Sequence, residues 1–273
     1  MLHTINYFIT RLFDVILYPF TFVNDFWGIL FLSAVSSLVV LVVYKYLSSP
    51  EKIKDSKDKI KANILAIRLY RDFWKVILTS FGKSVLYTLK YFSLNLLPLL
   101  VVLPVLAPIF AQMDVRYGMR PFTTDEVAVV KAYFNEDVEN LGIKLVESDS
   151  FKPLMKPVFI KAEKQVNWKV AVQAQEAVDL EIQVGDSTYK KALAAGNYKG
   201  AISNKKYSGS KIDHFMYPAE PLFNSGKELN AVYIAHPGKT VNFLGTRIHW
   251  LWHYLVWVLV MVLGLRKKFG VEF

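Results

Sequence analysis

The chain has 273 residues, of which 53% are hydrophobic, a formal net charge of +10 and no cysteine. The hydrophobic share exceeds that of an ordinary soluble domain and indicates an integral membrane protein. The absence of cysteine excludes disulfide bonds and thiolate chemistry. The basic excess suits anionic lipid, ribosomal RNA or an acidic protein partner, and we expect no binding to DNA.

Residues 1–23 are expected to form an amphipathic helix. Apolar side chains recur there at helical spacing, with Asn6, Thr10, Arg11 and Asp14 between them. The apolar positions are Ile5, Phe8, Ile9, Leu12, Phe13, Ile16, Leu17 and Phe20. We expect no signal peptide, because the segment lacks a basic start and a small-residue cleavage site. The helix should lie in the membrane interface as an anchoring or packing element.

Two uncharged segments are long enough to cross a bilayer. Phe26 to Tyr44 and Tyr91 to Gln112 contain no charged residue, and at about 1.5 Å per residue each matches the hydrocarbon thickness. We therefore expect transmembrane helices over 24–48 and 91–113.

Polar residues and prolines on these spans predict either a packing face or a polar groove. Three serines on the first span follow at i, i+3 and i+4, a pattern that permits close helix packing, the commoner use, or lines a hydrated groove. Each proline of the second span, at positions 98, 104 and 108, removes a backbone donor, which predicts a kinked, partly wet helix. The expected groove-lining residues are Ser33, Ser36, Ser37, Asn95, Pro98 and Pro104.

Residues 49–90 are expected to form a cytoplasmic helical hairpin. Positions 45–90 hold eleven Lys or Arg against four acids, a net charge of +7 that places this short loop in the cytoplasm by the positive-inside rule. The first helix carries a narrow, coiled-coil-like apolar seam. The seam residues are Ile53, Ile60, Ile64 and Ile67. A cytoplasmic partner would contact a group that we term the lysine patch: Lys52, Lys54, Lys57, Lys59 and Lys61.

Residues 114–247 have the composition of a soluble β domain. The runs 166–173 and 178–184 alternate apolar with more polar residues and predict half-buried antiparallel strands. Weaker strands are expected at 126–134, 140–147, 157–162, 188–193 and 230–236. About seven short strands favour an extracytoplasmic all-β sandwich of immunoglobulin-like type. The segment 196–228 is expected to hold little regular structure.

A third transmembrane helix is expected over 248–265, followed by a cytoplasmic tail, 266–273. Its outer end is rich in aromatic residues, as at a membrane interface, and three consecutive basic residues stop it. The apolar part from Trp250 to Leu265 covers only about 24 Å, against a hydrocarbon core of about 30 Å. Local thinning of the bilayer or shielding by a partner is implied.

The chain shows no catalytic motif. His249 and His253 have a spacing compatible with shared metal ligation, but no carboxylate or thiol lies near them in sequence and both fall among interfacial aromatics. The sequence contains no phosphate-binding glycine loop, nucleophile elbow or HExxH motif. We therefore expect neither an enzyme nor a bound metal or other cofactor.

In the order of its parts the chain resembles the YidC/Oxa insertase superfamily, including its shorter archaeal and endoplasmic-reticulum relatives. The shared arrangement is an interfacial helix (2–20), a span (26–44), a charged hairpin (50–90) and a returning span (91–112). The segment SPEKIKDSKDKIKANILAIRLYRD stands in the place of the family's hairpin. The resemblance implies help in moving hydrophobic segments into the bilayer through a groove open to cytoplasm and lipid, without nucleotide hydrolysis.

We therefore expect an insertase-like protein of the bacterial inner membrane, with its β domain in the periplasm. Its expected partners are membrane lipid and nascent membrane proteins, with the ribosome as a further candidate. A structural subunit of an envelope complex, which would bind an envelope protein through the β domain, is the first alternative. A sensor that couples a ligand at the β domain to the hairpin is the second. Hydration at Ser36 and Asn95 separates insertase from scaffold, because a scaffold needs no water there.

Overall fold

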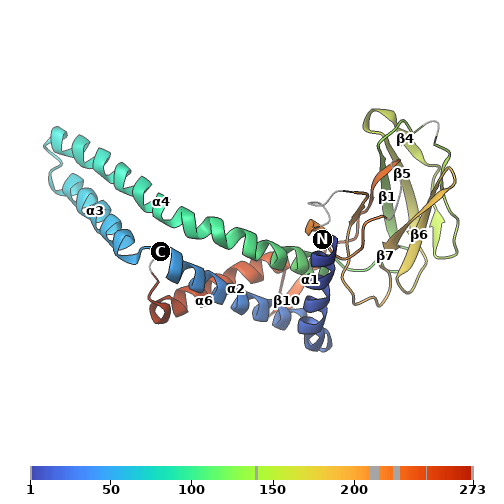
Figure 1. The fold of residues 1–273 in the computed structure, drawn as a ribbon, viewed down its shortest axis with the longest axis horizontal. Coiled ribbons are helices and arrows are strands. Elements are labelled where there is room, and N and C mark those ends of the chain that lie inside the picture. Colours follow the sequence, from blue (N-terminus) through green and yellow to red (C-terminus); the bar gives the residue numbers. More distant parts are fainter. Residues whose placement is uncertain (1, 139–140, 210–214, 224–227, 244, 272–273) are drawn as a thin grey trace. The chain divides into compact units, whose positions relative to one another are not determined.

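The chain combines α-helices with antiparallel β-sheets in two compact units (Figure 1). The computed structural model describes residues 2–138, 141–209, 215–223, 228–243 and 245–271. The β unit comprises Met1–Ile29 with Pro108–Leu251, and the helical unit comprises Leu30–Ala107 with Trp252–Phe273.

Among the described residues, three helices are long and apolar enough to cross a membrane: α2, α4 with its π-helical extension η2, and α6. The helices are α1 (Leu2–Leu17), the 3₁₀ helix η1 (Tyr18–Phe22), α2 (Asp25–Leu47), α3 (Pro50–Leu69), α4 (Trp74–Met113), η2 (Asp114–Gly118), the 3₁₀ turn η3 (Lys161–Glu163) and α6 (Trp250–Phe269). The helix α6 continues through the three basic residues that we expected to end it.

The helix α4 replaces two segments that we expected to be separate. It has 40 residues, so at about 1.5 Å per residue it is roughly twice as long as a hydrocarbon core is thick. The second helix of the hairpin and the second span are therefore one continuous helix. It passes through Pro98, Pro104 and Pro108 without an assigned break.

The helices α3 and α4 lie side by side as an antiparallel hairpin (Figure 1). Pro50 occupies the first turn of α3, where a missing backbone donor has no helical partner to lose. Lys57 lies over the Tyr91 ring at 5.6 Å, and Lys59 lies over the Tyr87 ring at 5.4 Å. The lysine that comes later in α3 contacts the tyrosine that comes earlier in α4, so the two helices run antiparallel.

Apolar side chains of α2, α4 and the C-terminal segment form the core of the helical unit. The buried members are Leu41, Tyr44, Val102, Val262 and Val271. The prediction of apolar spans is consistent with this core, because each span contributes at least one buried side chain to it.

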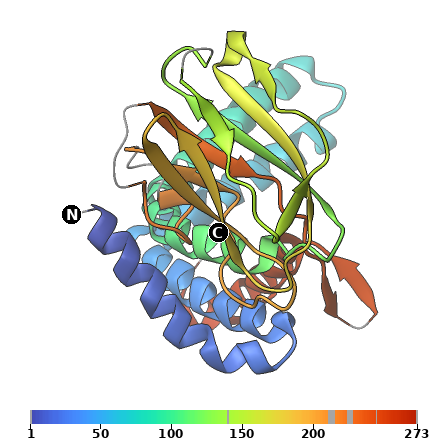
Figure 2. The ribbon, with the colours of Figure 1, turned by 90° about the vertical axis from the view of Figure 1, so that its right-hand side faces the viewer.

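Two antiparallel sheets make up the folded body of the β unit (Figure 2). The strands are β1 (Val127–Phe134), β2 (Ile143–Leu145), β3 (Phe151–Pro153), β4 (Val158–Ile160), β5 (Gln165–Val172), β6 (Val178–Val184), β7 (Ser187–Leu193), β8 (Lys205–Tyr207), β9 (Leu229–Ile234), β10 (Val241–Phe243) and β11 (Thr246–Ile248). The larger sheet has the order β3-β5-β1-β9-β8, with β4 also paired to β5, and the smaller has the order β2-β6-β7. The hairpin β10–β11 forms a separate ribbon.

The two sheets share one hydrophobic core, to which alternate residues of each strand contribute. On β6, Leu180, Ile182 and Val184 are buried while the residues between them are not. Trp168 of β5 belongs to the same cluster. The strong strands expected from alternation are thus confirmed. Within 196–228, where we expected little regular structure, the three-residue strand β8 forms and pairs with β9, while 210–214 and 224–227 lie outside the described residues.

Candidate functional site

The serines of α2 lie in a helix–helix contact within the helical unit. Ser33, Ser36 and Ser37 are all fully buried. The Ser37 hydroxyl donates to the Ser33 carbonyl oxygen at 2.6 Å and also approaches the Val258 carbonyl oxygen of α6 at 3.4 Å. The small side chains allow α6 to pack closely against α2, which is the first of the two uses we considered. Their role in lining a groove stays a prediction.

The polar residues of α4 have different surroundings from one another. Asn95 is partly buried, and its amide donates to the Tyr91 carbonyl oxygen of the preceding turn at 2.8 Å. Pro98 is buried, whereas Pro104 is exposed. The six predicted groove residues lie on two helices, with the serines on α2 and Asn95 and the prolines on α4, and their grouping in one groove stays a prediction.

The hairpin seam follows a heptad-like spacing but differs from the predicted one at Ile64. Positions 53, 56, 60, 63 and 67 of α3 are buried or partly buried, whereas Ile64 is 55% exposed. Intervals of three and four keep one narrow stripe facing the partner helix, so Ser56 and Asn63 occupy seam positions. The facing positions on α4 are Ile77, Ser80, Ser84, Tyr87, Tyr91, Leu94 and Pro98. The prediction was wrong at Ile64 because it assumed that every seam residue is apolar.

The lysine patch divides into bound and solvated side chains. Lys59 forms an ion pair with Asp55 at 2.9 Å, and this exposed carboxylate raises the pKa of the Lys59 amine. Lys61 is 3.9 Å from Asp58, and Lys57 lies against the Tyr91 ring. The remaining members, at positions 52 and 54, are exposed. Surface pairs of this kind add little stability because solvent screens them, so most of the patch remains available to a partner.

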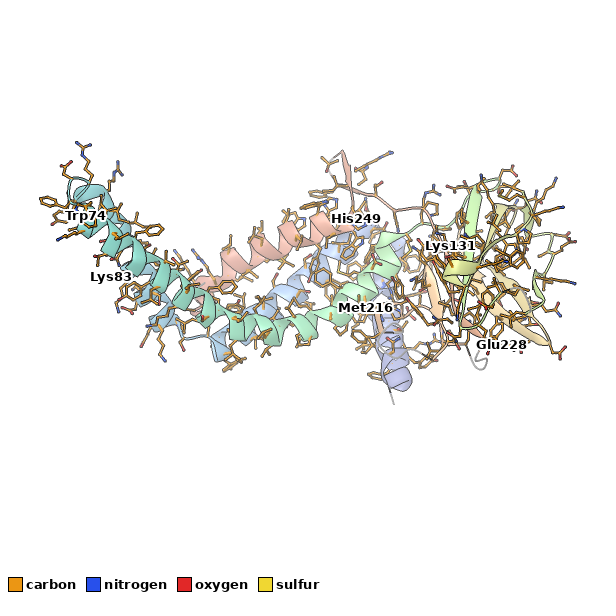
Figure 3. All side chains as sticks on the ribbon, turned by 90° about the horizontal axis from the view of Figure 1, so that it is seen from above. Trp74, Lys83, Lys131, Met216, Glu228 and His249 are labelled. Carbon is orange, nitrogen blue, oxygen red and sulfur yellow. The ribbon has the colours of Figure 1, made fainter. Side chains whose placement is uncertain are left out.

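A continuous apolar stripe runs along the exposed side of α4. We term it the α4 stripe: Trp74, Leu78, Phe81, Val85, Leu89, Phe92 and Leu96, each between 39% and 67% exposed. Figure 3 labels Trp74 at the start of α4 and Lys83 farther along. At about 3.6 residues per turn, Lys83 and Lys90 project from the other side of the helix. The spacing of the stripe is visible in the sequence, but its exposure is not.

The helix α1 directs polar side chains toward the protein and apolar side chains outward. This is the reverse of a helix on the surface of a soluble protein. Two polar residues of α1 point inward: Asn6 is buried, and the Thr10 hydroxyl accepts a hydrogen bond from the Gln112 amide at 2.9 Å. Phe8, Leu12 and Val15 are exposed on the other face. A helix whose polar groups bind protein and whose apolar groups remain uncovered suits a lipid interface.

Two ion pairs fasten this part of the β unit, and sequence reasoning did not predict either. Arg116 of η2 binds Asp14 of α1 and also donates to the Gln112 side chain. Lys239, which precedes β10, binds Asp25 at the start of α2 at 2.7 Å. The partners lie far apart along the chain, so no local pattern could have revealed the pairs.

A second polar cluster lies inside the β unit. The Lys191 ammonium is buried and binds Glu220 and the Ser203 carbonyl oxygen, the latter at 2.7 Å. Burial lowers the pKa of Lys191, and the attraction of Glu220 opposes that shift. Burial, with a smaller effect from Lys191, lowers the pKa of His236 to about 3. Lys191 and Glu220 bind each other, and His236 bonds to the Ala194 backbone and the Asn204 side chain, so the cluster is structural.

Known proteins provide no relative for this chain: no family model matches it, and neither a curated protein nor a solved structure does. Within the described residues, no three His, Cys, Asp or Glu side chains gather in a way that could hold a metal ion. The candidate functional surface is therefore the helical hairpin with its α4 stripe.

Proposed function

We propose that this protein is an insertase-like membrane protein of the YidC/Oxa type, which assists the insertion or assembly of other membrane proteins. The observation that carries the proposal is the α4 stripe. It extends apolar surface along the part of α4 that a bilayer of ordinary thickness cannot cover. An exposed apolar surface of this length on a protein indicates a binding partner.

The stripe would receive a hydrophobic segment before it enters the bilayer. Leucine and aromatic side chains bind apolar segments without a sequence requirement, as a general assistant needs. The lysine patch on α3 would contact an acidic partner or ribosomal RNA near the same hairpin. Positive charge on a short loop favours the cytoplasmic side, so we place the hairpin in the cytoplasm.

The spans would then lower the barrier to passing polar flanks. A polar group without a partner costs several kcal/mol in hydrocarbon. Hydroxyl and amide groups on α2 and α4 can offer hydrogen bonds to such flanks, and proline removes backbone donors from α4. This step requires α6 to separate from the serines of α2, since they are buried against it.

We assign the β unit to the opposite side of the membrane, as an immunoglobulin-like sandwich in the periplasm of a bacterial inner membrane. The pair of antiparallel sheets around one core supports the assignment as a sandwich. In this scheme the β unit holds the interfacial helix and does not contact the substrate during transfer.

Site-specific photo-crosslinking tests the proposal in living cells. Probes at Phe81 and Leu89 should capture many different nascent membrane proteins, and probes at Lys83 and Lys90, on the other side of α4, should capture far fewer. Probes at Ser36 and Asn95 should capture the same substrates at a later stage. Lipid alone, or one stable protein, at all stripe positions would contradict the insertase proposal.

The structural-subunit alternative has its own supporting observation. Leu154 and Met155, in the turn between β3 and β4, and Val158 and Phe159 of β4 form an exposed apolar patch at the edge of the larger sheet. An envelope protein could bind there. A probe at Phe159 that captures one partner in stoichiometric yield, while the stripe probes capture none, would favour this alternative.

A further inference from the structure

A cavity of about 690 Å³ lies inside the β unit, where α1, η1 and η2 meet the loops of the β domain. Its charged lining residues are Asp14, Asp25, Arg116, Lys199 and Lys239, and its lining tyrosines are Tyr18, Tyr117 and Tyr198. The volume is within the range of small-molecule sites. Neither the insertase proposal nor any step of it uses this cavity.

The cavity lies next to the ends of all three candidate spans. Its lining includes Asp25 at the start of α2 and Tyr117 directly after α4, and Thr240 and Asn242 lie shortly before α6. A chain that crosses a membrane three times alternates between its sides, so the start of α2, the end of α4 and the start of α6 share one side. The lining residues therefore stand at the membrane surface.

The lining carries charges of both signs, with one cation left over. Arg116 is paired with Asp14, and Lys239 is paired with Asp25. Lys199 is exposed and has no ion pair among the residues that the structure describes. The side chain of Asp14 remains 45% exposed beside Arg116.

One rim of the cavity is apolar. Tyr18 and Val23, which line the cavity, are 63% and 52% exposed, and the Tyr18 ring contacts the ring of Phe22, which is 72% exposed. The rim therefore continues the uncovered apolar face of α1. A ligand with a charged end and an apolar end would satisfy both parts of this surface.

We propose that the cavity binds the headgroup of a phospholipid, with phosphatidylethanolamine as the preferred ligand. Lys199 would bind the phosphodiester, with Arg116 and Lys239 beside it, because cations form charge-assisted hydrogen bonds with phosphate oxygens. The ligand's ammonium group would donate to Asp14. The acyl chains would leave across the rim at Tyr18 and Phe22.

Lipid titration of the purified full-length chain in detergent, followed by native mass spectrometry, tests the proposal. Phosphatidylethanolamine should bind with one-to-one stoichiometry and more tightly than phosphatidylcholine, whose quaternary amine has no N–H to donate. It should also bind more tightly than phosphatidylglycerol, which has no ammonium group to donate to Asp14. Equal binding of all three lipids would overturn the assignment.

Matched lysine variants locate the site. Lys199→Ala should weaken phosphatidylethanolamine binding about tenfold, the effect of one lost charge-assisted hydrogen bond. Lys144→Ala, an equally exposed lysine of β2 outside the cavity, should leave binding unchanged. Equal effects of the two variants would overturn the site. Soluble glycerophosphoethanolamine that binds as tightly as the lipid would identify a free headgroup ligand and overturn the lipid assignment.

Discussion

Arg116 and Asp14 join the end of α4 to α1 through an ion pair whose partners lie 102 residues apart. The Arg116 side chain is only 10% exposed, and it also contacts the backbone of Thr10. This one guanidinium therefore fastens α1 at several points.

Replacing Arg116 with glutamine should loosen α1 from the β unit. The loss of several charge-assisted hydrogen bonds should lower the free energy of unfolding by about 1–3 kcal/mol. Hydrogen exchange at residues 6–17 should accelerate in the variant. Arg11→Gln is the control, because Arg11 is exposed and bonds only to Tyr7 of the same helix among the described contacts. Equal exchange in both variants would contradict the role of Arg116.

Replacing Gly28 with alanine should destabilise the β unit by overpacking. A Cβ at this position would lie 2.1 Å from the Tyr117 hydroxyl oxygen and 3.1 Å from the ring carbon that carries it. Overpacking of this kind costs about 1–3 kcal/mol. The double variant Gly28→Ala with Tyr117→Phe should recover part of that loss, because the closest atom is gone. Thermal unfolding in detergent would measure both, and a double variant less stable than the alanine variant would refute the explanation.

Replacing Glu220 with glutamine should strongly destabilise the β unit. The change leaves the buried Lys191 ammonium without its carboxylate, and breaking a buried pair from one side costs about 3–5 kcal/mol. The double variant Lys191→Met with Glu220→Gln removes the uncompensated charge. It should be more stable than Glu220→Gln alone in a urea titration, and the reverse order would show that the charge is not the cause.

The stability of the β unit should fall as the pH drops below about 6.5, because of His236. Its pKa is about 3 in the folded chain, owing mainly to burial, and about 6.5 when unfolded. Between these pH values the unfolded chain binds a proton that the folded chain excludes. The free energy of unfolding therefore falls by up to about 1.4 kcal/mol for each pH unit below 6.5. Urea unfolding from pH 6.5 to 4.5 should show a smaller slope for His236→Gln than for the natural chain. Identical slopes would contradict this role of His236.

Replacing Leu89 with serine should reduce the proposed insertase activity more than replacing Leu86 with serine does. The two leucines are 60% and 63% exposed, but only Leu89 belongs to the α4 stripe. Insertion of a hydrophobic reporter segment into proteoliposomes that contain each variant would measure the difference. Because residue type and exposure match, equal activities would remove the stripe from the mechanism.

The sequence predicted the parts of the fold that depend on local periodicity. Alternation identified β5 and β6, and uncharged length identified α2, α4 and α6 as candidate spans. Short strands were harder, because β3 and β8 have only three residues each and are defined by their pairing. Helical spacing also placed α1 correctly.

Long-range relationships could not be predicted. Polar residues of α1 suggested a water-facing side, whereas Asn6 and Thr10 face protein. Ile64 is apolar, as expected of a seam residue, but in the folded hairpin Asn63 is partly buried and Ile64 is exposed. The charged lining of the cavity comes from five separate parts of the chain. Only the folded arrangement brings Asp14, Arg116 and Lys199 together.

The polar face of α1 binds residues that are synthesised much later than α1 itself. Thr10 bonds to Gln112 and Pro218, which follow it by 102 and 208 positions. A chain made from its N-terminus therefore completes α1 before any of these partners exists. We expect the apolar face to meet lipid early, whereas the polar face stays hydrated until β9 has paired with β1. Docking of α1 thus has two stages, first of its apolar face and then of its polar face. The second stage can occur only after nearly the whole chain has been translated and folded.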